Sequence, residues 1–191
     1  MAKVKVANQA FPYPMPMVVV STVVDGKVNH EAIGWCNRVN HSPPMLGVAS
    51  NKIHHTNRGI HLHRAFGVSV PSVEQLEMVD YVGLVSGADR DKSAAFESFY
   101  GELEHAPMIA TCPLTMACRL VQVVDLPTNE LFIGEIVEAF CEEACISHGK
   151  PDVEKLRPFC LTMPDNRYWT VGSYAGKAWS VGMRLRKSDA G

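Results

Sequence analysis

The run of residues 17–24 (MVVVSTVV) constrains the fold most strongly, because it is β-branched, apolar and too short for a buried helix. It ends in Asp25-Gly26, a dipeptide typical of two-residue hairpin turns, and a second strand is expected from about Val28. The sequence therefore predicts an antiparallel β-hairpin as its first clear element.

The remaining elements also point to local, antiparallel pairing. Ser72 and Gln75 have the spacing of a capping box and predict a helix that continues through Leu76, Val79 and Val82. A helix over residues 56–63, capped by Thr56 or Asn57, and a short helix over 91–99 are also predicted. The further predicted strands are 45–49, 65–70, 116–126, 130–140, 168–171 and 178–181, the two long ones joined by 127–129 as a hairpin. This order predicts an antiparallel barrel or sandwich with a few peripheral helices.

Length and composition indicate one globular domain over residues 1–191. The chain has 47% hydrophobic and 20% charged residues, which excludes intrinsic disorder. Its net charge of −2 argues against a nucleic-acid-binding protein. Prolines interrupt the uncharged stretch 6–24, so we expect no membrane segment, and the N-terminus does not resemble a signal peptide. Six cysteines without a CxxC pair indicate reduced thiols and a cytoplasmic protein.

The charge distribution suggests a binding site. Residues 32–73 contain no Asp or Glu, although a random share of the 20 acidic residues would place about four there. Residues 50–56 (SNKIHHT) combine hydroxyls, a lysine and imidazoles where a strand is expected to pass into a helix, whose N-terminus attracts anions. Two interpretations remain open: a bound anion such as phosphate, or a basic face paired with acidic residues elsewhere.

No motif predicts a catalytic residue or a metal site. His61 and His63 would point in different directions on a helix, and no carboxylate lies in the segment to orient a histidine ligand. Cys36 is interpreted as a small buried residue, and no GxSxG, HExxH, P-loop or GxGxxG pattern occurs.

The order of several short motifs resembles the flavin reductase-like, FMN-binding split-barrel family, in its flavoredoxin branch. The similarity extends from about Phe11 to Trp179. The motifs that carry it are residues 20–29, 34–37, 42–46, 50–56, 80–87, 91–92, 106–109, 112–113, 131–136 and 168–169.

The resemblance implies a homodimeric, Greek-key-like split β-barrel with noncovalent FMN near the subunit interface. It places Asn29, Trp35, Cys36, Asn37 and Arg38, the last four on a loop, along the flavin ring and ribityl chain. It assigns Ser50, Asn51, Lys52, His55 and Thr56 to the phosphate, and Ser86, Gly87 and Lys92 to the vicinity of the flavin. This chain has His54-His55-Thr56 where relatives often have Arg-Tyr-Thr, so an imidazole replaces a permanent cation.

The expected function is that of an FMN-binding redox protein that transfers electrons, with a redox protein partner or NAD(P)H as its electron source. The alternatives are an NAD(P)H-dependent flavin or ferric reductase, and a flavin-binding protein without turnover. The absence of a Rossmann fingerprint does not separate these, since split barrels do not use that motif.

Overall fold

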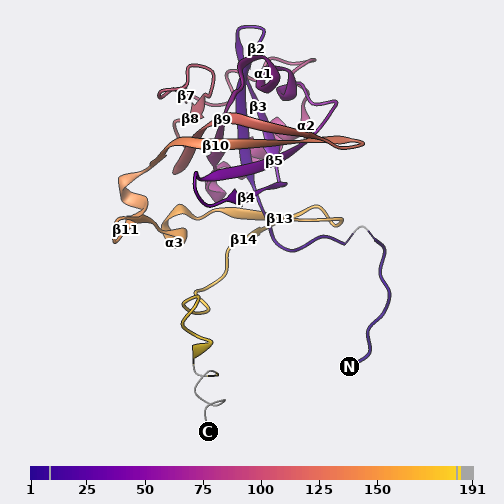
Figure 1. The fold of residues 1–191 in the computed structure, drawn as a ribbon, viewed down its shortest axis with the longest axis vertical. Coiled ribbons are helices and arrows are strands. Elements are labelled where there is room, and N and C mark those ends of the chain that lie inside the picture. The colour runs from indigo at the N-terminus through magenta and orange to yellow at the C-terminus, as the bar shows by residue number, and fades with distance from the viewer. Residues whose placement is uncertain (9, 184, 186–191) are drawn as a thin grey trace.

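The computed structural model describes residues 1–8, 10–183 and 185, and its main feature is an antiparallel sheet of seven strands (Figure 1). In spatial order the strands are β3 (Lys27–Ile33), β2 (Val18–Val24), β6 (Ala65–Val70), β9 (Leu114–Asp125), β10 (Asn129–Cys141), β5 (Met45–Asn51) and β4 (Cys36–Asn40). A smaller sheet contains β1 (Met15–Pro16), β13 (Phe159–Thr162) and β14 (Arg167–Thr170). The predicted mainly β, antiparallel fold with few helices is confirmed.

The first hairpin forms as its turn sequence predicts. Val24 pairs with Lys27, and the two residues between them, Asp25 and Gly26, have φ angles of 49° and 77°. Positive φ at both central residues is what a type I′ turn requires, and Asp and Gly tolerate it. The hairpin sets the direction of β3, which carries several polar side chains discussed below.

The long hairpin of β9 and β10 connects the two halves of the sheet. β9 pairs with β6 on one side, and β10 pairs with β5 on the other. Phe66 of β6 and Phe132 of β10 are fully buried in the largest cluster of the core. Truncation of such a buried Phe to Ala typically costs about 3–5 kcal/mol of folding free energy. This core holds β5 at a fixed position before the chain turns into the first helix.

Helices cover parts of the sheet rather than forming a layer of their own. α1 (Thr56–His63) packs against β2 and β6, and α2 (Leu76–Leu84) packs against β3. A 3₁₀ turn, η1 (Val73–Gln75), precedes α2, and the Gln75 side chain accepts a 3.0 Å hydrogen bond from the Ser72 backbone as a capping box requires. The remaining short elements are α3 (Val153–Leu156), η2 (Glu143–Cys145), β7 (Ser98–Phe99), β8 (Met108–Ile109), β11 (Ile146–Ser147) and β12 (Lys150–Pro151).

Three local predictions are wrong. The helix over 91–99 is absent: a turn at residues 93–94 is followed by β7, whose backbone pairs with β8 instead of forming a helix. The strand over 178–181 is a turn, and Trp179 is 96% exposed with no neighbouring strand to stabilise an extended form. The predicted loop of residues 35–38 is largely the edge strand β4.

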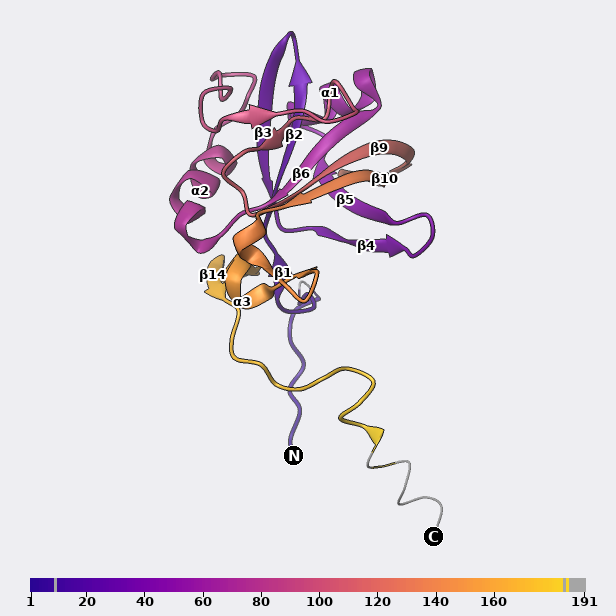
Figure 2. The same ribbon diagram turned by 90° about the vertical axis from the view of Figure 1, so that its left-hand side faces the viewer.

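The described segments before β1 and after β14 extend away from the sheets. Figure 2 shows the N-terminal segment and the segment after β14 leaving the body on the same side. No helix within the described ranges is long and apolar enough to cross a membrane.

Candidate functional site

Two adjoining cavities lie between β3, the corner where β5 passes into α1, and the loop after α2. Their volumes are about 220 and 400 Å³. The cavities share four lining residues, Asn29, His55, Gly87 and Lys92, all of which the sequence analysis assigned to a binding site. Thr56 and Ser86 line the smaller cavity. We call the two together the polar pocket.

A direct hydrogen bond joins β3 to the start of α1 at the wall of the polar pocket. Asn29 Nδ2 donates to Thr56 Oγ1 at 2.7 Å, and both side chains are buried. Because Thr56 Oγ1 accepts this bond, its own hydroxyl proton is available to a ligand. The predicted caps of α1 are therefore wrong: no side chain caps this helix, whose N-cap residue is His55.

The loop after α2 approaches Asn29 so closely that only glycine fits. A Cβ on Gly87 would lie 2.0 Å from Asn29 Oδ1 and 2.9 Å from His55 Cδ2. Ser86 shapes this loop, since its hydroxyl accepts from the Ala88 backbone at 3.2 Å. The loop thus brings Ser86 and Gly87 against β3. The sequence analysis placed these two residues and Asn29 of β3 near the same ligand.

Lys92 forms part of the pocket wall through a buried side chain. Its ammonium donates to the backbone oxygens of Val82 and Val85 at 3.0 and 3.1 Å, which lie at the end of α2. Burial lowers the pKa of Lys92, and the carboxylate of Glu31 opposes that shift. Lys92 therefore stabilises the end of α2 while contributing positive charge to the pocket.

Glu31 is a functional candidate that sequence reasoning missed. It is 7% exposed on β3 and lines the smaller cavity. Its carboxylate accepts from Ser50 Oγ at 2.9 Å and forms a close ion pair with His54 Nδ1. The expectation that no carboxylate orients a histidine here is wrong, since Glu31 lies one residue before the acid-free segment. The abrupt end of acidic residues at this position was the available signal.

Two of the four Lys and Arg residues in the acid-free segment pair with acids from elsewhere in the chain. Lys52 forms an ion pair with Asp125 and lies outside the polar pocket, while Arg58 pairs with Asp25 at 3.2 Å. Asn51 Oδ1 accepts from the Ile53 backbone and shapes the turn beside Lys52. The interpretation as a basic face paired with acids is confirmed for these two cations.

His55 differs from those cations. Among the described residues its ring has no hydrogen-bond or ion-pair partner, and it lines both cavities of the polar pocket. Arg58 is also available to a ligand. Its exposed ion pair with Asp25 contributes little to stability, so a bound anion can compete with Asp25 for the Arg58 guanidinium. His55, Thr56 and Arg58 are therefore the anion-binding candidates that the structure brings together.

Three of the other predicted residues line a separate, apolar cavity beside the edge strand β4. Trp35, Cys36 and Asn37 border a space of about 440 Å³ whose other walls include Phe11, several prolines and Leu131. We call it the edge groove. Asn37 Oδ1 accepts from the Arg38 backbone, and the Arg38 guanidinium contacts His41. Burial raises the pKa of Cys36 to about 12, so its thiol stays protonated at neutral pH.

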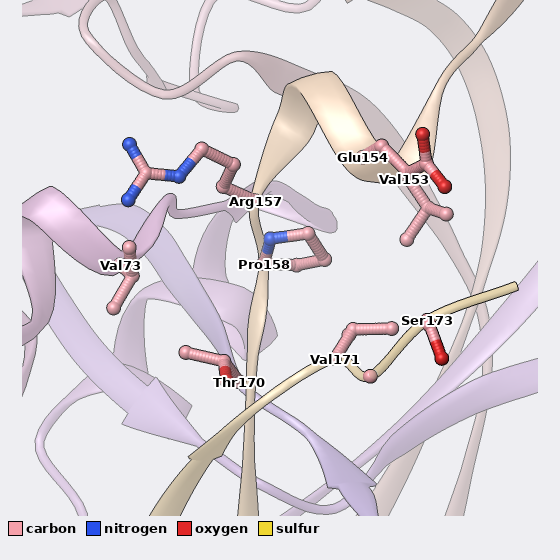
Figure 3. A pocket seen from close by; sticks show the side chains of 9 residues that line it. Val73, Val153, Glu154, Arg157, Pro158, Thr170, Val171 and Ser173 are labelled. Atoms are coloured by element: carbon pink, nitrogen blue, oxygen red, sulfur yellow. The ribbon is translucent and has the colours of Figure 1, made fainter.

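A third cavity, of about 340 Å³, lies between α3 and the segment after β14 (Figure 3). Its charged side chains are Glu154 and Arg157, and Arg157 forms a close ion pair with Glu74. None of the residues that the sequence analysis assigned to a site lines this cavity. We therefore regard the polar pocket, and not this cavity, as the candidate functional site.

Comparison with known proteins places the chain in a family. Residues 10–151 match the family model described as "Flavin reductase like domain". A flavoredoxin crystal structure from Methanosarcina acetivorans is 50% identical, with a TM-score of 0.95 over 97% of this chain and 100% of that one. Flavoredoxin of Desulfovibrio vulgaris (Miyazaki F) is 31% identical, with a TM-score of 0.88 over 95% and 100%. An uncharacterized protein of Archaeoglobus fulgidus is 31% identical over 74% of this chain and 80% of its own.

The family model covers the seven-stranded sheet and ends before β13 and β14, whereas the two flavoredoxin structures match over 97% and 95% of this chain. The resemblance that the sequence motifs indicated is therefore confirmed, and the antiparallel architecture is that of a split barrel. The chain belongs to the flavin reductase-like family and, within it, to the flavoredoxin branch.

Proposed function

We propose that this protein binds FMN noncovalently in the polar pocket and transfers electrons through it, as a redox protein of flavoredoxin type. The observation that carries the proposal is the 50% identity to a flavoredoxin across 97% of the chain. A TM-score of 0.95 means that the backbone around the pocket is shared, so a shared ligand is the simplest explanation.

The residues of the polar pocket fit the chemistry of FMN. His55, Thr56 and Arg58 offer the donors and positive charge that a phosphate needs. Ile53 and Leu84, which are 84% and 77% exposed at the rim of the smaller cavity, offer an apolar surface to a flat ring system. Gly87 lets the loop after α2 lie directly against Asn29 and His55, where any Cβ would collide with both. FMN, when bound, supplies the redox chemistry, and the protein supplies binding, orientation and electrostatics.

We further propose that the functional unit is a homodimer. In one chain the group Trp35, Cys36 and Asn37 lines a different cavity from the group around Asn29. The exposed Trp35 and Val39, at 40% and 49%, leave the edge groove with apolar surface that a second copy would cover. A symmetric dimer through this surface would bring the two groups to one interface, and light scattering should report about twice 21.0 kDa.

The proposed cofactor and activity can be tested on the purified protein. After reconstitution, gel filtration and acid release should yield FMN at about one per chain. Stopped-flow mixing with NADH and NADPH then separates the functions: slow reduction by both, with fast exchange to a protein redox partner, is expected of a carrier. Rapid and selective oxidation of one nicotinamide would instead identify a reductase. Failure to retain any flavin would contradict the proposal.

A further inference from the structure

A buried carboxylate in the wall of an anion-binding pocket needs a compensating charge. Glu31 lies in the polar pocket, where the proposed ligand carries a phosphate of about −1.5 to −2 charge at neutral pH. An isolated buried carboxylate is costly, and it would also repel that ligand. His54 supplies the compensation through its ion pair with Glu31.

Two further groups face the Glu31–His54 pair, one from β5 and one from the loop after α2. Ser50 on β5 donates to Glu31, and Lys92 on the loop after α2 lies close enough to influence both partners. The hydrogen bond with Glu31 raises the pKa of His54 above its ordinary 6.5, whereas burial and Lys92 lower it. The hydrogen bond with Glu31 is the largest of these influences, so the net shift of the His54 pKa is upward and the imidazolium form is favoured.

The pair also connects two elements that build the pocket. Glu31 belongs to β3, two residues after Asn29, and His54 immediately precedes His55 and Thr56. A charge change at the pair therefore occurs beside the residues that would hold the ligand phosphate.

We propose that Glu31 and His54 form a proton-linked positioning pair for the flavin site, so that loss of the His54 proton removes a positive charge from the pocket wall and weakens FMN binding. This inference rests on the proposed function. Neither residue is a catalytic residue, because both act through the charge and placement of the pocket wall.

The chain offers a matched control for this pair. His61 Nε2 lies 2.9 Å from Glu130 Oε1, so it is a second histidine–carboxylate pair of the same kind. His61 lines neither cavity of the polar pocket. His61→Gln should therefore leave FMN binding and its pH dependence unchanged.

The test is FMN affinity between pH 5.5 and 8.5, measured by flavin fluorescence quenching, for wild type, Glu31→Gln, His54→Gln and His61→Gln. As pH rises through the His54 pKa, the FMN affinity of wild type and of His61→Gln should fall about tenfold more than that of His54→Gln. Riboflavin, which lacks the phosphate, should show a smaller change. The FMN phosphate also titrates in this pH range, but it does so in every variant. Comparison with His54→Gln therefore cancels its contribution.

A second measurement does not depend on ligand and covers the case in which Glu31→Gln folds poorly. NMR titration of the imidazoles in ligand-free protein should show His54 with a pKa above 6.5, and Glu31→Gln should lower it. If FMN binds but wild type and His54→Gln have the same pH profile, the inference is wrong and the proposed function stands. If FMN binds at no pH, both are wrong.

Discussion

The polar pocket and the edge groove differ in what a single chain can do with them. The polar pocket has a floor of buried, hydrogen-bonded groups, such as Asn29, Thr56 and Glu31, which are already oriented by neighbouring elements. The edge groove is bordered mainly by apolar side chains and is open to solvent along the unpaired edge of β4. Under the proposals above, the polar pocket would bind the phosphate within one chain, whereas the edge groove would need a second surface to cover it.

The largest loss of FMN affinity is expected when a side chain is added at Gly87. Gly87→Ala places a Cβ 2.0 Å from Asn29 Oδ1, which must displace Asn29 from Thr56. We expect FMN affinity to fall about 100-fold, or roughly 2.7 kcal/mol, by fluorescence titration. Gly172→Ala is the control, because an added Cβ there meets nothing within 4 Å. Equal affinities for the two variants would remove the loop after α2 from the site.

A somewhat smaller loss is expected when the hydroxyl of Thr56 is removed. Thr56→Val keeps the shape but leaves the Asn29 amide without its acceptor and removes a donor to the phosphate. FMN affinity should fall about tenfold to thirtyfold, and the preference for FMN over riboflavin should shrink. Lys52→Ala should change either affinity by no more than about twofold, since its ammonium pairs with Asp125 outside the pocket. The reverse ranking would mean that Lys52 is the phosphate ligand.

A substitution in the edge groove should affect FMN and riboflavin affinity equally, unlike a substitution in the polar pocket. Trp35→Ala is expected to weaken FMN and riboflavin by a similar factor, about fivefold, and to weaken the dimer, because it removes apolar contact and no phosphate donor. Trp179→Ala is the control, since that side chain is 96% exposed on the C-terminal segment. Light scattering and paired titrations measure both effects. A selective loss of FMN over riboflavin would place the phosphate in the edge groove.

The smallest effect is expected from Cys36→Ser. The pKa of about 12 keeps this thiol protonated at neutral pH, so it lacks the thiolate that redox or nucleophilic chemistry requires. The rate of reduction per bound FMN should stay within about twofold of wild type in stopped-flow mixing with dithionite. A loss of orders of magnitude at full FMN occupancy would show that Cys36 takes part in electron transfer.

Short-range sequence signals predicted the local elements well. Asp25-Gly26 fixed the first hairpin, and the bounds of α1 were predicted to the residue. The prediction for residues 91–99 was wrong because Ser98–Phe99 pairs with the distant strand Met108–Ile109, and this tertiary contact outweighs a weak helical pattern.

The site was harder to predict because its contacts are long-range. Asn29 and Thr56 are 27 positions apart, and nothing in their spacing indicates a hydrogen bond. The acid-free segment was a real signal, but it marked His54 without its partner Glu31, which lies just outside the segment. Likewise, a count of cations could not show that Lys52 pairs with Asp125 at the end of the long hairpin.

The most direct test of the polar pocket as the flavin site is an amide chemical-shift map of the ligand-free protein titrated with FMN. The largest shifts are expected at Asn29, His55 and Thr56 and in the loop around Gly87, because these residues line the polar pocket. Shifts confined to the cavity between α3 and β14, around Arg157 and Thr170, would contradict this location.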